Sequence, residues 1–194
     1  MKTSEFIIIL TLIISVVIFM KIQHNDLIYI KSTINDKKYL VRDNEDSDKA
    51  ANLLAVLDNN IQTLRTHLYD NKKTKYKKYE KYIDQLNRKI KYCVISESIP
   101  GSSYTSYSVN KGEEIVFCLR SKKNDKLHII NLLMYVALHE LSHVACPEWG
   151  HTPLFKDIFS FITEVAISIN LYEKIHFDEN PEEYCGLSIT DSIV

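Results

Sequence analysis

The segment from Lys126 to Ala145 constrains the fold more than any other part of this 194-residue chain. It contains no Gly or Pro, and apolar residues recur on nearly every side of a helix drawn through it. A helix that is apolar almost all round is buried on all sides. We therefore expect a central helix over residues 126–145, with Asn124 and Asp125 capping its start.

Other segments predict a mixed α+β domain around this helix. The chain has only 4 Gly and 4 Pro, which favours long helices over a sandwich of many strands. Apolar spacing predicts further helices over residues 49–68 and 75–91 and a last helix after Thr152 and Pro153, a good N-cap followed by a favoured first residue. Short β-rich runs predict strands over residues 27–33, 38–42, 92–95, 107–109 and 115–120, the first two forming a hairpin around Asn35 and Asp36.

The N-terminus carries a 15-residue apolar run from Phe6 to Met20. As a helix it spans ~23 Å, and Lys21 and Ile22 can extend it toward the ~30 Å hydrocarbon core. A cleaved signal peptide is the alternative, but no small-residue cleavage site follows the run. We expect an uncleaved membrane anchor over residues 6–22, so that residues 1–25 form the anchor and residues 26–194 one domain.

Lysines around this run predict its orientation. Lys2 precedes it, whereas Lys21, Lys31, Lys37 and Lys38 follow it soon after. The positive-inside rule then predicts a single-pass protein with its C-terminal domain in the cytosol or inside a virion.

Four cysteines are present, without a CxxC pair. A zinc knuckle or redox motif is therefore not expected. A chain of this length can bury a core without covalent crosslinks, so we expect reduced thiols. A bridge between Cys93 and Cys118 is the alternative.

Residues 72–91 carry nine Lys and Arg, with Tyr76, Tyr79 and Tyr82 spaced three apart. One interpretation is a surface for phosphate backbones or unstacked bases. The other, which we favour, is a solvated charged face whose tyrosines pack on the core, because the net charge is only −1 and no base-reading motif is present.

The central helix contains His139-Glu140-Leu141-Ser142-His143, an HExxH pattern. Residues four apart share one helical face, so both imidazoles can converge on one metal ion, and zinc is the metal typical of such sites. Glu140 lies about 100° further round the helix. It can reach a water on the metal and act as general base in hydrolysis. Two histidines and a glutamate would be costly to bury in an apolar helix without such a role.

The third ligand is expected just beyond this helix, which must end at Cys146-Pro147. His151 sits at the corner before the next helix, from where its side chain can reach back to the metal. Glu164, on that next helix, and Cys146 are the rivals. Cys146 and Trp149 replace the Gly and His of the metzincin pattern and exclude that class.

The stretch from His139 to Phe155 resembles small zinc metallopeptidases of the WLM and SprT-like kind, in which a GHxxxF-like segment follows the metal helix. Residues 107–120 and Tyr184-Cys185-Gly186 look like a related group of hypothetical metallopeptidases of large DNA viruses. The resemblance covers about residues 92–190.

This resemblance implies a small zincin-like α+β domain with Zn²⁺ on His139, His143 and His151, and with Glu140 catalytic. It implies a protein or peptide substrate that pairs with a strand before the metal helix, either residues 115–119 or the neighbouring strand. Such relatives cleave proteins crosslinked to DNA, which would suit the basic residues 72–91, although a membrane anchor departs from them.

The sequence leaves two interpretations of Tyr184. Tyr184 can stabilise an oxyanion or be a buried structural tyrosine. The remaining histidines lack partners at ligand spacing and are expected to be ordinary surface or core residues (His24, His67, His128 and His176). The sequence therefore predicts a membrane-anchored zinc metallopeptidase, with a non-catalytic structural membrane or virion protein of the same fold as the alternative.

Overall fold

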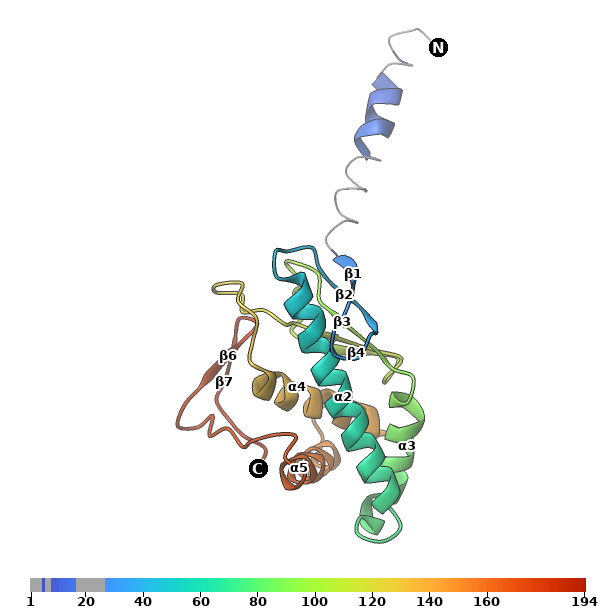
Figure 1. The fold of residues 1–194 in the computed structure, drawn as a ribbon, viewed down its shortest axis with the longest axis vertical. Helices are drawn as coiled ribbons and strands as arrows, with labels where there is room; N and C mark the ends of the chain where they lie inside the picture. The colour runs from blue at the N-terminus through green and yellow to red at the C-terminus, as the bar shows by residue number, and fades with distance from the viewer. Residues whose placement is uncertain (1–4, 6–7, 17–26) are drawn as a thin grey trace.

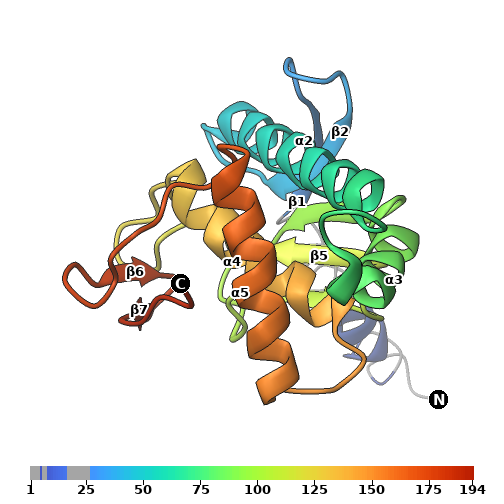
Figure 2. The same cartoon turned by 90° about the horizontal axis from the view of Figure 1, so that it is seen from below.

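The computed structural model describes residues 5, 8–16 and 27–194. It is a mixed α+β fold, as predicted, in which four long helices pack with a three-stranded sheet and two hairpins (Figures 1 and 2). The helices are α2 (Ser47–Asn71), α3 (Glu80–Ile90), α4 (Ile130–Ala145) and α5 (Pro153–Ser168). The strands are β1 (Leu27–Lys31), β2 (Lys38–Arg42), β3 (Val94–Glu97), β4 (Tyr107–Val109), β5 (Glu114–Phe117), β6 (Glu182–Tyr184) and β7 (Leu187–Ile189).

The three-stranded sheet has the order β3-β5-β4. β3 runs parallel to β5 and β4 runs antiparallel to it. The central strand β5 therefore has both edges paired, and β4 is an outer strand of this sheet. The predicted hairpin of β1 and β2 is confirmed, with Leu27 opposite Arg42 and Lys31 opposite Lys38.

Helix α4 is the buried centre of the molecule, as its sequence predicts. It packs against α2, α3, α5 and β4, and its side chains are buried from Leu132 to Leu138. It begins four residues later than predicted, at Ile130. Residues 120–128 instead fold back on themselves through bonds from Ser121 N to Lys126 O and from His128 N to Leu119 O, with Asp125 at a positive φ of 55°. That turn uses the carbonyl oxygen of Lys126, which in a helix starting there would accept from the N–H of Ile130.

The basic segment ahead of α3 packs its tyrosines inward. A short 3₁₀ turn, Lys77–Tyr79, leads directly into α3. The Tyr79 ring stacks on Phe161 of α5 with 3.8 Å between centroids, and the buried Tyr76 meets the same ring edge-on. The favoured structural interpretation of the stripe is confirmed for these two residues, because their faces are used in the core.

The C-terminal hairpin of β6 and β7 was not predicted, and it changes the cysteine chemistry. It lies at the side of the molecule away from α3 (Figure 2), and Cys185 at its turn forms a disulfide with Cys118, just after β5. The expectation of reduced thiols is therefore wrong for this pair, and the alternative bridge from Cys93 to Cys118 is also wrong. Cys93 and Cys146 are free. Sequence spacing could not reveal the pairing, because the bonded cysteines are 67 residues apart.

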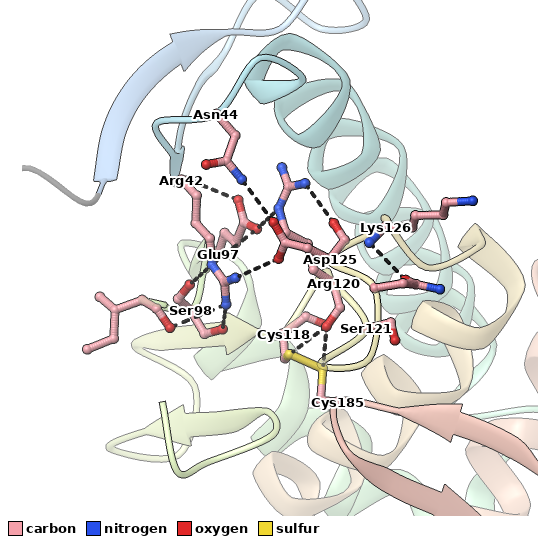
Figure 3. Close-up of polar contacts among 12 residues, drawn as sticks. Arg42, Asn44, Glu97, Ser98, Cys118, Arg120, Ser121, Asp125, Lys126 and Cys185 are labelled. Atoms are coloured by element: carbon pink, nitrogen blue, oxygen red, sulfur yellow. Dashed lines mark hydrogen bonds and ion pairs between the residues drawn. A yellow bond between two sulfur atoms is a disulfide. The ribbon is translucent and has the colours of Figure 1, made fainter. Parts of the chain in front are cut away.

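A network of buried charges joins the first hairpin, α2 and the sheet (Figure 3). Glu97 accepts hydrogen bonds from Arg120 Nε and from the backbone N–H of Arg42, both at 2.8 Å. Arg120 also donates through both terminal nitrogens to the carboxylate of Asp46, at 2.9 and 2.6 Å. Each charge in this network has an opposite partner, which lowers the free-energy cost of burying it.

The predicted anchor over residues 6–22 lies in part outside the described residues. Residues 8–16 form a helix with exposed side chains. Within the described parts of the chain, no helix has the length and apolar character needed to cross a membrane.

Candidate metal centre

Three imidazoles meet at the C-terminal end of α4. His139 and His143 lie one turn apart on that helix, and His151 reaches them from the loop before α5. Their Nε2 atoms form a nearly equilateral triangle, with 3.1 Å from His139 to His143, 3.2 Å from His143 to His151 and 3.1 Å from His151 to His139. The structure thus brings together all three residues that the sequence singled out as ligands.

This triangle fits a metal ion. Nitrogen ligands about 2.0–2.1 Å from a tetrahedral zinc lie about 3.3–3.4 Å from one another, close to the spacing observed. Three histidines leave a fourth position free, the arrangement typical of catalytic rather than structural zinc sites. The described residues therefore contain a group that can hold one metal ion.

Phe155 forms the floor beneath the three histidines. Its ring stacks on His143 with 4.2 Å between centroids and meets His139 and His151 edge-on at 5.1 and 4.9 Å. Phe155 belongs to the first turn of α5. Thr152 caps this helix, because its hydroxyl group accepts a hydrogen bond from the backbone N–H of Phe155 at 3.3 Å. The same helix start therefore fixes the ring that the imidazoles rest on.

The loop that carries His151 is held by Lys111. Its ammonium group donates to the carbonyl oxygens of Cys146, Pro147 and Glu148 at 2.9, 3.1 and 3.2 Å. Gly150, with φ of 78°, then turns the chain back toward α4 in a conformation that suits glycine. Lys111 thus neutralises exposed carbonyl groups at the end of α4 and positions the third histidine.

The environment keeps two of the imidazoles neutral in the metal-free protein. Burial lowers the pKa of His139 to about 3, and the neighbouring His143 and His151 add to the effect. Burial also lowers the pKa of His143 to about 4, with contributions from His151 and Lys111. A neutral imidazole is the form that binds metal, so these two side chains need to lose no proton at neutral pH.

Glu140 lies beside the histidines without touching an opposite charge. It is 7% exposed, and among the described residues its carboxylate makes no hydrogen bond or ion pair. Burial alone raises its pKa to about 7. A carboxylate with this pKa suits proton transfer at neutral pH.

A cavity of about 580 Å³ opens onto this group. One wall holds the three histidines and Glu140, and other walls come from β4 with the residues before it, and from the C-terminal hairpin. Those walls contribute Thr105, Ser106, Tyr107, Ser108, Tyr184, Leu187 and Ile189. Tyr107 and Ser108 belong to β4, which is an outer strand of its sheet.

No protein-family model matches the chain. The chain is 45% identical to uncharacterized protein R325 of Acanthamoeba polyphaga mimivirus over 166 residues, which cover 86% of this chain and 84% of R325. It belongs to the R325 family.

Shorter matches link the R325 family chain to two further viral proteins. It is 38% identical over 71 residues to uncharacterized protein 136R of Invertebrate iridescent virus 6, covering 36% of this chain and 39% of the relative. It is 37% identical over 83 residues to uncharacterized protein 042R of Invertebrate iridescent virus 3, covering 42% and 50%. Among solved structures it is similar to Wss1 from Saccharomyces cerevisiae, with a TM-score of 0.37 and 18% identity over 50% of this chain and 83% of Wss1.

In this member of the R325 family, the rival ligands lie outside the histidine group. Glu164 is exposed on α5 and accepts a hydrogen bond from Ser160, beside a separate cavity near Tyr76. Cys146 is buried, and its thiol is not among the converging ligand atoms.

Sequence reasoning missed several residues of the site. The loop before β4 contributes Thr105 and Ser106 to the cavity, and the unpredicted hairpin contributes Leu187 and Ile189. No local pattern marks them, because they come from two segments far apart in the chain. Lys111 was missed as well, because no sequence pattern connects it to the loop of His151.

Proposed function

We propose that this protein is a zinc-dependent metallopeptidase. The observation that carries the proposal is the triangle of Nε2 atoms, 3.1–3.2 Å on a side, beside a buried carboxylate that has no partner among the described residues. A structural metal site does not require an unpaired glutamate beside it, whereas hydrolysis requires a general base. The HExxH spacing and the resemblance of residues 139–155 to WLM and SprT-like metallopeptidases support the same conclusion.

The residues divide the work as follows. His139, His143 and His151 would hold Zn²⁺, which when bound supplies a Lewis acid that polarises a carbonyl group and makes water a stronger nucleophile. Glu140 takes the proton of the attacking water and gives it to the departing amine. Lys111 keeps His151 in place, and Phe155 supports all three rings.

The substrate we propose is an extended stretch of polypeptide. An extended peptide can add to the free edge of β4, because that strand is paired only with β5 in its sheet. The strand neighbouring residues 115–119 is thus the better candidate of the two implied by the resemblance, since β5 has no free edge. Tyr107 and Leu187 give the adjoining cavity apolar walls for substrate side chains.

The test combines metal content with hydrolysis. The full-length protein should bind one zinc ion and cleave an unfolded protein substrate, and Glu140→Gln should retain the zinc while cleavage falls at least ~10²-fold. His139→Ala, His143→Ala and His151→Ala should each lose zinc, measured by elemental mass spectrometry. Glu164→Ala is the matched control and should keep it.

Two results would contradict the proposal. Loss of zinc in Glu164→Ala but not in His151→Ala would move the third ligand. Equal cleavage by the wild type and Glu140→Gln would show that the cleavage is not its own, and the non-catalytic structural membrane or virion protein would become the better hypothesis.

Two further parts of the proposal come from the sequence. The first is membrane attachment through residues 6–22, with the domain on the cytosolic or virion side; alkaline extraction that releases the full-length protein would contradict it. The second is contact of residues 72–91 with nucleic acid. The affinity for DNA should then fall steeply as the salt concentration rises.

A further inference from the structure

The cavity that Glu140 lines also contains a pair of hydroxyl groups, Ser106 Oγ and Tyr184 Oη, 2.5 Å apart. Ser106 comes from the loop before β4 and Tyr184 from β6, which are 78 residues apart. Tyr184 is only 3% exposed. A buried tyrosine hydroxyl normally has a partner for both its proton and its lone pairs.

One of the two hydroxyl protons of Ser106 and Tyr184 has no acceptor among the described residues. The backbone N–H of Cys118 donates to Ser106 Oγ at 3.2 Å, so Ser106 accepts there. The pair shares one hydrogen bond, which uses one of its two hydroxyl protons. The Cys118 N–H also faces Tyr184 Oη, which accepts there, and among the described residues neither hydroxyl group donates to a further acceptor. The second proton is therefore free to be donated into the cavity.

Covalent structure holds this pair in place. Cys118 binds Ser106 through its backbone and Cys185 through the disulfide, and Cys185 is the next residue after Tyr184. The four residues thus form a closed ring of two hydrogen bonds, one disulfide and one peptide bond. The ring of Tyr184 also packs against His128 at 5.1 Å between centroids. Such support fixes the direction of a donor before any ligand arrives, as electrostatic stabilisation of a developing charge requires.

We infer that Tyr184 is a further catalytic residue, which donates a hydrogen bond to the carbonyl oxygen of the scissile peptide as that oxygen gains negative charge, and that Ser106 positions it. This inference rests on the proposed function. The hydrogen bond between the two hydroxyl groups can run in either direction; in the arrangement that we infer, Ser106 donates to Tyr184 and the phenol proton is left for the substrate. Burial raises the pKa of Tyr184 well above its usual range, so the phenol keeps this proton at neutral pH.

The step balances without further reactants. Water adds to the carbonyl carbon while Glu140 takes one of its protons, and the carbonyl π electrons move to the oxygen that Tyr184 faces. The C–N bond then breaks, the nitrogen receives the proton from Glu140, and the carbonyl double bond forms again. Tyr184 retains its own proton throughout.

The experiment compares Tyr184→Phe with the wild-type, zinc-loaded full-length protein. Loss of one oxyanion donor should lower kcat by about 10²–10³-fold with KM nearly unchanged. A phosphinic peptide, a tetrahedral anion, should bind the variant about 10²-fold more weakly by calorimetry, whereas an uncleaved peptide should bind equally. Zinc content and the unfolding midpoint of the metal-free protein should change little.

Matched variants separate catalysis from structure. Tyr172→Phe removes another buried hydroxyl group, which does not line the cavity and accepts a hydrogen bond of 3.2 Å from the backbone N–H of Ile175. This variant should leave kcat unchanged. Ser106→Ala should lower kcat about tenfold, and Ser106→Thr, which keeps the hydroxyl group, should restore it.

Different outcomes identify which idea fails. If Glu140→Gln abolishes cleavage but Tyr184→Phe leaves kcat and phosphinic peptide affinity intact, the role of Tyr184 is overturned and the proposed function stands. If neither the wild type nor any variant cleaves peptides, the proposed function fails. The donor role of Tyr184 is then judged from the binding of the phosphinic peptide alone. Weaker binding to Tyr184→Phe then supports the donor role, and equal or absent binding overturns it.

Discussion

Glu97 and Glu140 are both buried in this protein, and their surroundings are opposite. Glu97 has no exposed side-chain surface and is held by Arg120 and by the backbone of Arg42. Glu140 is almost as deeply buried, yet in the described part of the chain no donor or cation contacts it. Both lose hydration on folding, but only Glu97 regains hydrogen bonds. The comparison indicates that Glu97 serves the fold, and the lack of a partner for Glu140 agrees with the proton-transfer role that we propose for it.

The largest effect should come from breaking the paired network. Arg120→Leu leaves Glu97 with Arg42 alone, through its backbone N–H at 2.8 Å and its Nε at 3.6 Å, and leaves Asp46 without its two hydrogen bonds to Arg120. We expect the free energy of unfolding to fall by about 3–5 kcal/mol, the usual cost of removing one partner of a buried ion pair. Urea unfolding of the metal-free protein measures it. A loss no larger than that of the nearby surface variant Lys122→Leu would contradict the structural role of the network.

Acid should weaken the same network through Asp46. Its hydrogen bonds with Arg120 hold the pKa of Asp46 below its usual value. A carboxyl group with a lowered folded-state pKa stabilises the fold above its unfolded pKa of about 3.9, and this contribution disappears as the pH falls through the folded value. Wild type should therefore be more stable than Asp46→Asn at pH 6, and the gap should shrink below about pH 4. A gap that stays constant down to pH 3 would count against the assignment.

Removing the unpaired charge of Glu140 should not lower the free energy of unfolding, in contrast to Arg120→Leu. Glu140→Gln keeps the size of the side chain but replaces a group whose charged form is disfavoured by burial. The metal-free variant should unfold at the same urea concentration as the wild type or a higher one. A clear loss of stability would mean that Glu140 has a structural partner and would remove the contrast with Glu97.

The smallest effect is expected at an exposed ion pair. Lys78 approaches Asp157 at 3.3 Å, with most of its side chain in solvent. Surface pairs of this kind add little to stability because water screens them. Lys78→Ala should leave the urea midpoint unchanged, and a measurable shift would show that the contact between the basic segment and α5 depends on charge as well as on the stacking of Tyr79.

The parts of this structure that the sequence predicts are those with a local cause. The apolar run before Ala145 predicts a buried helix, and the spacing of His139 and His143 predicts a shared face. Thr152 predicts the start of α5, which in turn brings His151 to the corner. These expectations depend on residues within one or two helical turns.

The parts that escape prediction depend on contacts between distant segments. The start of α4 moves because residues 120–128 bond to one another instead. The pairing of Cys118 with Cys185 and the meeting of Ser106 with Tyr184 require a hairpin whose two strands are only 3 residues each. Strands this short carry no periodic pattern, so neither the disulfide nor that wall of the cavity is visible in the sequence.

The disulfide has a consequence for the integrity of the molecule. It closes a covalent loop between residues 118 and 185, and that loop contains every candidate ligand together with Glu140. A single cut anywhere inside the loop would leave the two fragments joined as one molecule. If the protein nicks its own chain there, as peptidases can, the damage stays hidden on a non-reducing gel and becomes visible only when the sulfur bridge is reduced.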